Sequence, residues 1–265
     1  MSPIALFVSD IDGCLAAPYQ PYDLDRLQAL AAHAHAAGAL SDNGTPPTAR
    51  PVLTLCSGRP YSYVEAMAQT LGLVTPVLFE SGAGRFDPVA AQTTWHPALT
   101  DELEEQLDTM RAWFRTEAIP GTKISLDHAK RAQAGIVTPD PAEIQAIRPK
   151  ALAFVENHLP GLKVFTTDVS IDVLSPQITK RAGLEWLGAH LNVSLASMAY
   201  IGDTDGDIVA LEAVGRSFAP TNAHASVKSC VDHVTQDAVA AGTLAAYQQC
   251  MAHNNARPCH TERAS

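Results

Sequence analysis

The sequence lacks the cysteine pattern of a disulfide-bonded protein. Its five cysteines are odd in number, and no two of them form a Cys-x-x-Cys pair. Both features argue against a closed disulfide framework. Cys14 and Cys56 adjoin predicted strand ends, where a small buried thiol is the ordinary role. We therefore expect a reduced protein in a cytoplasmic compartment.

Long apolar runs are also missing. No stretch of the sequence approaches the roughly 18 apolar residues that a membrane-spanning helix needs. The chain starts with Met1-Ser2-Pro3-Ile4, without a basic start, and the apolar run that follows is too short for a signal peptide. We expect a soluble protein with no membrane partner.

Positive charge is scarce. The chain has 18 Lys and Arg residues against 28 Asp and Glu residues, which gives a formal net charge of −10. This balance argues against nucleic acid or an anionic membrane as the main partner. Hydrophobic residues make up 46% and charged residues 17%, as is typical of a folded globular protein. An acidic protein that binds phosphate needs a local cation to offset its own carboxylates.

Short apolar runs alternate with segments of helical spacing at both ends of the chain. Runs of the first kind are typical of strands buried on both faces of a parallel sheet. The predicted strands cover residues 4–9, 51–56, 76–80 and 198–201, and the predicted helices cover 24–38, 61–72 and 179–191. This alternation favours a right-handed parallel α/β sheet.

The middle of the chain has a different pattern. Two long helical segments, 99–117 and 140–158, alternate with extended segments at 122–138 and 162–174. We interpret residues 85–175 as a small antiparallel α+β module inserted into the larger domain. The predicted division is a discontinuous core of residues 1–84 and 176–265, the insert 85–175, and a flexible tail from about residue 252.

Four polar motifs follow the ends of predicted strands or open a predicted helix. They are Asp10-Ile11-Asp12-Gly13, Ser57-Gly58-Arg59, Lys180, and Gly202-Asp203-Thr204-Asp205-Gly206-Asp207. The carboxyl ends of the strands of an open parallel sheet form one rim, and ligands bind there. We expect the three loop motifs to converge on this rim, with Lys180 reaching in from a helix N-terminus.

Such a rim suits phosphoryl chemistry. Carboxylates without histidine or cysteine companions favour a hard ion such as Mg²⁺. Lys180 would supply positive charge for a phosphoryl group, and the Ser57 hydroxyl with nearby backbone N–H groups would supply donors. Positioning and charge neutralisation carry most of the catalysis in phosphoryl transfer.

Asp10 and Asp12 are two residues apart, so in an extended segment their side chains lie on the same side. One carboxylate can attack phosphorus while the other protonates the leaving oxygen. This division requires that the pKa of Asp12 be raised relative to that of Asp10. Asp12 would afterwards deprotonate the water that hydrolyses the aspartyl-phosphate.

The motifs resemble the four motifs of haloacid dehalogenase superfamily phosphatases, in the expected order. They read Asp10-x-Asp12-Gly13-x-Leu15, Ser57-Gly58-Arg59-Pro60, Lys180 and Gly202-Asp203-x-x-x-Asp207. The insert is similar to the α/β cap of the Cof-type branch, which includes sucrose-phosphate, mannosylphosphoglycerate and archaeal-type phosphoglycolate phosphatases. The resemblance implies a Rossmann-like parallel-sheet core with an inserted α+β cap.

The resemblance also implies roles for the acidic residues. Asp10 would be the nucleophile and a metal ligand. Asp12 would be the acid/base and would bind the metal through its backbone carbonyl. Asp203 would bind Mg²⁺ directly, and Asp207 would be either a ligand or an anchor beside the site.

Further residues would bind the phosphate or the rest of the substrate. Ser57, Gly58 and Lys180 match the phosphate-binding positions, and Asn222 is expected on the phosphate side of the site. Arg59 would contact the substrate or brace its loop. The insert offers additional candidates for substrate contact, namely Trp95, His96, Lys123, Asp127, His128, Lys130 and Arg131.

Three positions depart from the family pattern without removing a charged catalytic group. Cys14 stands where threonine is usual, Ser81 replaces an asparagine, and Gly206 replaces the asparagine before Asp207. The last two departures put in doubt the hydrogen bonds that support the catalytic groups, and Gly206 could loosen Asp207.

The sequence thus predicts a Mg²⁺-dependent phosphatase for a small phosphate ester, a sugar phosphate or a short phospho-acid, working as a monomer or homodimer. A phosphomutase of the same superfamily is the nearest alternative, and it would require a bisphosphate activator. A phosphate-binding regulator without turnover is a third hypothesis. Asp12 argues against it, because receiver domains place no acid/base there. The sequence does not identify the substrate.

Overall fold

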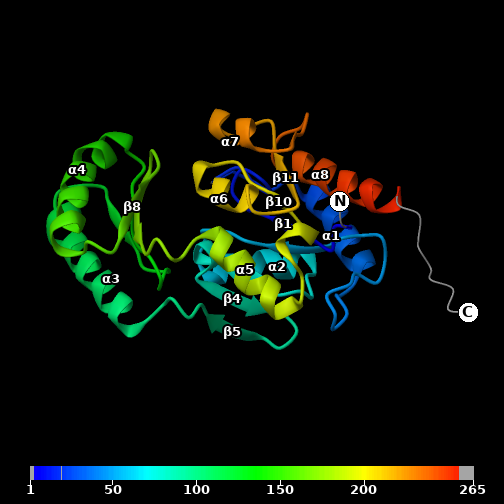
Figure 1. Cartoon of the computed structure of the whole chain (residues 1–265). Coiled ribbons are helices and arrows are strands. Elements are labelled where there is room, and N and C mark those ends of the chain that lie inside the picture. Colours follow the sequence, from blue (N-terminus) through cyan, green and yellow to red (C-terminus); the bar gives the residue numbers. More distant parts are fainter. Residues whose placement is uncertain (1–2, 19, 257–265) are drawn as a thin grey trace, which may run out of the picture.

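The computed structural model describes residues 3–18 and 20–256. A parallel sheet of five strands forms the centre of the core, with helices around it (Figure 1). The strand order is β12-β11-β10-β1-β2, and every neighbouring pair is parallel. The bounds are β1 Leu6–Ser9, β2 Val52–Leu55, β10 Met198–Ile201, β11 Arg216–Ala219 and β12 His233–Val234. The predicted parallel α/β core is confirmed.

The register of the three central strands sets the position of the loops that follow them. Ser9, the last residue of β1, lies opposite Leu55 on one side and Ile201 on the other. All residues of β1, β2 and β10 are buried, which explains their apolar composition. Because these strands end at one level, the loops after them begin at one rim.

Helices cover both faces of the central sheet. The helices α1 (Leu24–Ala37), α2 (Tyr61–Leu71) and α8 (Val239–Asn255) share a hydrophobic cluster with Phe7 on one face. The helices α5 (Lys180–Leu191), α6 (Ile208–Leu211) and α7 (Ala225–Cys230) share another cluster with Leu6 and Val8 on the opposite face. Side chains of β1 alternate between these clusters, as the two-residue period of a strand requires.

A second, antiparallel sheet lies beside the first. Its order is β3-β4-β5, formed by Val77–Phe79, Gly84–Asp87 and Gln92–Trp95. A parallel bridge between Cys56 and Leu78 connects it to the end of β2. Residues 84–95 therefore pair with the core side, although most of them fall in the segment 85–175 that we propose as the insert.

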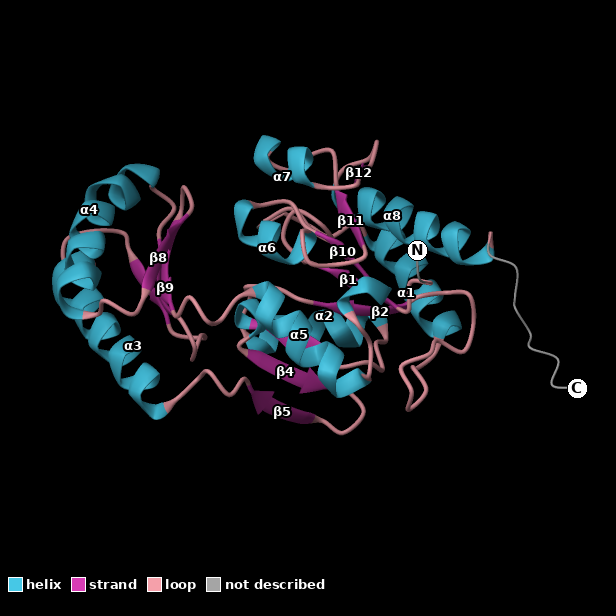
Figure 2. Cartoon of the chain, viewed as in Figure 1, coloured by secondary structure: helices cyan, strands magenta, loops and turns pink. Residues whose placement is uncertain are grey.

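The third sheet, here called the cap sheet, is antiparallel in the order β6-β7-β9-β8. Its strands are β6 Ser125–Asp127, β7 Ala134–Val137, β8 Lys163–Thr166 and β9 Ser170–Leu174. The helices α3 (Asp101–Trp113) and α4 (Pro141–His158) pack on its outer face and share a hydrophobic cluster with it. The inner face is turned toward the core (Figure 2).

The end of the chain differs from the prediction of a tail beginning near residue 252. Helix α8 continues to Asn255, because the Asn254 side chain accepts a hydrogen bond from Ile4 N and donates to the carbonyls of Ile4 and Ala49. The rest of the predicted tail, with Cys259, lies outside the described residues apart from Ala256. Among the helices that are described, none is both long and apolar enough to cross a membrane.

Candidate active site

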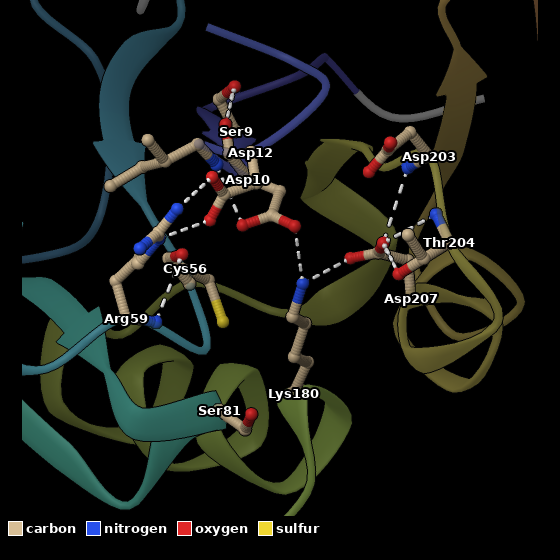
Figure 3. A network of polar contacts seen from close by, with 12 residues as sticks. Ser9, Asp10, Asp12, Cys56, Arg59, Ser81, Lys180, Asp203, Thr204 and Asp207 are labelled. Carbon is tan, nitrogen blue, oxygen red and sulfur yellow. Dashed lines mark hydrogen bonds and ion pairs between the residues drawn. The ribbon is translucent and has the colours of Figure 1, made fainter. Parts of the chain in front are cut away.

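The rim of the central sheet brings together Asp10, Lys180, Asp203 and Asp207 (Figure 3). Ser57 lines the same cavity. Asp10 directly follows β1, and Asp203 follows β10 after one glycine. Lys180 is the first residue of α5, and the Thr179 side chain caps that helix by accepting a hydrogen bond from Ala182 N. The loop motifs thus converge because their strands end at the same level of the sheet, and Lys180 joins them because α5 begins beside the rim.

Lys180 is the charge centre of this site. Its Nζ lies 2.7 Å from Asp10 Oδ2 and 2.5 Å from Asp207 Oδ1, with only 6% of the residue exposed. Burial alone would lower the pKa of Lys180, but the two carboxylates hold it well above its ordinary value. The ammonium group therefore stays charged at every physiological pH.

Asp207 is held by hydrogen-bond donors on both of its carboxylate oxygens. Tyr200 donates its hydroxyl to Oδ1, the oxygen that also meets Lys180, at 2.7 Å. Asp203 N, Thr204 N and the Thr204 hydroxyl donate to Oδ2. Burial would raise the pKa of Asp207, yet Lys180, Tyr200 and Thr204 bring it below its ordinary value. This arrangement favours an anchoring role for Asp207, and Gly206 has not freed it.

Asp203 has the opposite environment. Its Oδ1 is buried and has no hydrogen-bond partner among the described residues. Burial, followed by repulsion from Asp10 and Asp207, raises the pKa of Asp203 to about 8. A buried polar atom without a partner is rare in folded proteins and calls for an explanation, such as an ion.

Three carboxylates could hold that ion. Asp10, Asp203 and Asp207 each place one oxygen so that the three atoms lie within 4.8 Å of one another. An all-oxygen set suits a hard divalent cation. The unpartnered Asp203 oxygen is the observation that fits the residues to a metal.

Asp10 points into the same space. Its Oδ1 accepts a hydrogen bond from Ile11 N at 2.7 Å, and its Oδ2 meets Lys180. Burial raises the pKa of Asp10 to about 6, Lys180 opposes this shift, and Asp207 adds to it. Contacts to both carboxylate oxygens thus fix the orientation of the Asp10 side chain in a buried, strongly polar site.

Asp12 is engaged by Arg59. Arg59 Nε lies 2.6 Å from Asp12 Oδ2, and Arg59 Nη2 lies 2.7 Å from Asp12 Oδ1. The guanidinium group also stacks 4.8 Å from the centre of the Tyr63 ring. Bidentate pairing of this kind fixes the orientation of the carboxylate. The sequence left the role of Arg59 open, and the structure places it on Asp12.

Ser57 and Gly58 line the site from the loop after β2. Ser57 is buried, and its Oγ accepts a hydrogen bond from Arg59 N at 3.3 Å. Ser57 O accepts from the backbone N–H of Ser81 at 2.9 Å, a contact that does not depend on the side chain at position 81. The position of Ser57 and Gly58 on the cavity wall is consistent with the phosphate-binding role that we predicted.

The phosphate-side role predicted for Asn222 finds no support. Asn222 Nδ2 donates to Gly13 O at 3.0 Å, and Asn222 Oδ1 accepts from Val239 N at 2.9 Å. The residue does not line the cavity. Both ends of its amide take part in fastening the loop after β1 to the start of α8.

A cavity of about 580 Å³ opens between the rim and the inner face of the cap sheet. Of the cap candidates named from sequence, Asp127 and Lys130 line it. The remaining five, Trp95, His96, Lys123, His128 and Arg131, are absent from its described lining. Trp95, for example, packs edge-on against Phe79 at 5.1 Å instead.

The site also contains residues to which the sequence assigned no role, among them Tyr200 and Thr204 beside Asp207, and Phe165 and Asp172 on the cap wall. Two of them carried a usable signal. Tyr200 is the one hydroxyl in the run Met198–Ile201, and Asp172 is a charge within the apolar run 171–174. A polar group in a buried strand needs a partner, which points to a polar site.

A parallel sheet with acidic loops at its rim, a buried lysine and an inserted antiparallel sheet defines a class of hydrolase. The sequence model of the haloacid dehalogenase-like hydrolase family matches residues 89–246, more than half of the chain. The chain belongs to this family. The predicted family, fold class and enzyme class are thereby confirmed.

Individual relatives agree with this assignment. A protein of Natronomonas pharaonis named phosphoglycolate phosphatase is 23% identical over 263 residues, which cover 93% of this chain and 96% of the relative. The crystal structure of Thermoplasma acidophilum 0175 superposes with a TM-score of 0.70 at 18% identity, covering 94% of this chain and 99% of the other. The sucrose-phosphatase of Synechocystis sp. PCC6803, solved with sucrose and phosphate, gives 0.65 at 18% identity and covers 96% and 99%.

Proposed function

We propose that this protein is a phosphatase that hydrolyses a small phosphorylated metabolite with the help of Mg²⁺, through a phosphorylated Asp10. One observation carries the proposal. A buried ammonium group, Lys180, and an unpartnered buried oxygen of Asp203 flank the Asp10 carboxylate at the floor of a cavity. The named relatives, phosphoglycolate phosphatase and sucrose-phosphatase, support the same class of reaction.

Mg²⁺ would be held by Asp10 and Asp203, with Asp207 fixing Lys180 and the loop after β10. When bound, the ion would offset the acidic cluster and the charge of the phosphate. Lys180 contributes a second positive charge next to Asp10. We infer that the Ser57 hydroxyl, which lies on the cavity wall, donates to the phosphate oxygens.

Asp10 acts as the nucleophile. One of its carboxylate oxygens forms a bond to phosphorus while the bond from phosphorus to the leaving oxygen breaks, and Asp12 gives that oxygen a proton. Asp12 then removes a proton from water, which forms a new bond to phosphorus. The bond to Asp10 breaks, so that inorganic phosphate leaves and the carboxylate is restored.

Arg59 sets a condition on this cycle. Its two contacts hold both carboxylate oxygens of Asp12, whereas the first step needs Asp12 to reach the leaving oxygen. Entry of a substrate phosphate, an alternative partner for a guanidinium group, would release Asp12 for the first step.

The test is phosphate release from a panel of phosphate esters and from p-nitrophenyl phosphate, with Mg²⁺ and with EDTA. We expect EDTA to abolish turnover, and Asp10→Asn to lower kcat about a thousandfold or more. Asp25→Asn, on the exposed first turn of α1, is the matched control and should keep full activity. Activity that survives EDTA, or an active Asp10→Asn variant, contradicts the proposal. Release without a bisphosphate activator excludes a phosphomutase.

A further inference from the structure

The inner face of the cap sheet carries a row of four residues across its strands. Asp127 lies opposite Gly135, Gly135 opposite Asp172, and Asp172 opposite Phe165. Neighbours in register share a face of the sheet, so the four side-chain positions face the cavity together. In each strand the preceding residue points the other way and joins the cluster under α3 and α4. These residues are Leu126 in β6, Ala134 in β7, Ile171 in β9 and Val164 in β8.

Gly135 gives this row its shape. A Cβ atom at this position would lie 2.6 Å from Asp172 Oδ1 and 3.4 Å from Asp127 Cβ. Because Gly135 has no side chain, the Asp172 carboxylate can lie over β7. Lys130 then places its Nζ 2.8 Å from Asp172 Oδ1 and 3.6 Å from Asp127 Oδ2.

The two carboxylates keep part of their surface open to the cavity. The side chain of Lys130 is 11% exposed, while those of Asp127 and Asp172 are 21% and 23% exposed. Phe165, at the end of the row, is 49% exposed and also lines the cavity. The cap wall therefore offers hydrogen-bond acceptors next to an aromatic surface.

No cation on the cavity wall is left over for a second acidic group of the substrate. The described lining contains three cationic side chains, and all of them already contact carboxylates. Arg59 meets Asp12, Lys130 lies between Asp172 and Asp127, and Lys180 lies between Asp10 and Asp207. A carboxylate on the leaving group would meet the net negative charge of the Asp127–Lys130–Asp172 cluster, which repels it.

We propose that the row Asp127, Gly135, Asp172 and Phe165 selects phosphate esters with a neutral polyhydroxyl leaving group, a sugar or polyol, and disfavours leaving groups that carry a carboxylate. Hydroxyl groups donate to Asp127 and Asp172, and the C–H face of the sugar packs on Phe165. This inference deepens the proposed function and rests on it. The cavity volume, about 580 Å³, lies in the range of pockets that enclose small ligands.

The experiment compares kcat/KM for a hexose or hexitol phosphate with kcat/KM for phosphoglycolate, at saturating Mg²⁺. For the wild-type protein we expect kcat/KM to be about tenfold or more higher for the sugar or polyol ester, because its hydroxyl groups form hydrogen bonds to charged carboxylates. Asp172→Asn should raise KM for this ester about tenfold and should raise kcat/KM for phosphoglycolate several-fold. Phe165→Ala, a change at a half-exposed site, should raise KM for the sugar ester alone.

Controls separate this inference from the proposed function. Asp108→Asn, on an exposed residue of α3, is the matched control for Asp172→Asn and should leave the substrate ratio unchanged. If p-nitrophenyl phosphate is hydrolysed but the wild type prefers phosphoglycolate, the selectivity assigned to the row is wrong while the phosphatase stands. The same holds if Asp172→Asn and Phe165→Ala change both esters equally. A protein that hydrolyses none of these esters overturns both proposals.

Discussion

At the residue scale, Asp203 makes the stability of the metal-free protein depend on pH. The pKa of Asp203 is about 8 and that of Asp10 about 6 in the fold, and both groups have ordinary values near 3.8. The folded state therefore holds protons that the unfolded state has already lost. Stability contributed by these protons is present below pH 4 and is lost as pH rises through 6 and 8.

We predict that the thermal midpoint in EDTA falls between pH 5 and pH 8, and that the gain on adding Mg²⁺ is larger at pH 8 than at pH 6. A bound cation replaces the lost protons by stabilising the ionised carboxylates. Thermal unfolding at pH 5, 6, 7 and 8, with and without Mg²⁺, measures both effects. Asp203→Asn should flatten the profile in EDTA. An equal Mg²⁺ gain at every pH would show that Asp203 does not respond as described.

Two features of the backbone at position 13, beside Asp203, require glycine. The φ of Gly13, +69°, favours glycine, and a Cβ atom there would lie 1.8 Å from Asp203 Oδ2. We predict that Gly13→Ala lowers the free energy of unfolding by about 1–3 kcal/mol more than backbone strain alone, because the carboxylate must move. It should also weaken Mg²⁺ binding, which calorimetric titration measures.

A second glycine separates the clash from the strain. Gly121 has a φ of +75°, and nothing lies within 4 Å of the position of its missing Cβ. Gly121→Ala should therefore cost about 1 kcal/mol, the strain alone, and leave Mg²⁺ binding intact. If Gly13→Ala and Gly121→Ala lower the free energy of unfolding equally, the close contact between position 13 and Asp203 does not affect stability.

At the scale of elements, the short helical turn Glu80–Gly82 connects the site to the cap. Glu80 N donates to Arg59 O, and Ser81 N donates to Ser57 O, each at 2.9 Å. The buried Glu80 carboxylate accepts hydrogen bonds from the backbone N–H groups of Arg131 and Ala132. One turn thus holds the loop after β2 and the cap loop at the same time.

We predict that Glu80→Ala lowers the free energy of unfolding by about 2–4 kcal/mol, because it leaves two backbone N–H groups without their acceptor. Glu80→Gln, which keeps one acceptor oxygen, should cost less. Denaturant unfolding measures both values. Glu104→Gln is the matched control, since Glu104 meets the same Arg131 through a surface ion pair of small value. If Glu80→Ala and Glu104→Gln cost the same, the turn does not couple cap and core.

Elements with a local signal could be predicted from the sequence. Buried parallel strands appear as apolar runs, and loops at their carboxyl ends share a rim, so the sequence alone was enough to group Asp10, Ser57 and Asp203. The cap row could not be predicted, because it depends on the register between β7 and β9. The contacts of Asn222 could not be predicted either, because nothing in its surroundings in sequence reveals that its amide meets Gly13 and Val239.

At the scale of the whole molecule, two opposing fields act on an approaching substrate. The formal net charge of −10 repels a dianionic phosphate ester at long range. Lys180, and a cation if one is bound as we propose, would attract it at short range from within the cavity. Salt screens the long-range field, with a Debye length of about 10 Å at 0.1 M, and affects buried pairs much less. The balance between the two fields can therefore be read from the salt dependence of kcat/KM.

We predict that kcat/KM for a dianionic ester rises about two- to threefold between 20 and 200 mM KCl, at fixed saturating Mg²⁺. The reason is that salt weakens the repulsion by the whole surface while the contacts of Lys180, which is almost fully buried, persist. Initial rates measured far below KM give this quantity directly. A steady fall of kcat/KM with salt would mean that exposed cations guide the substrate, and the acidic surface would then have no part in its approach.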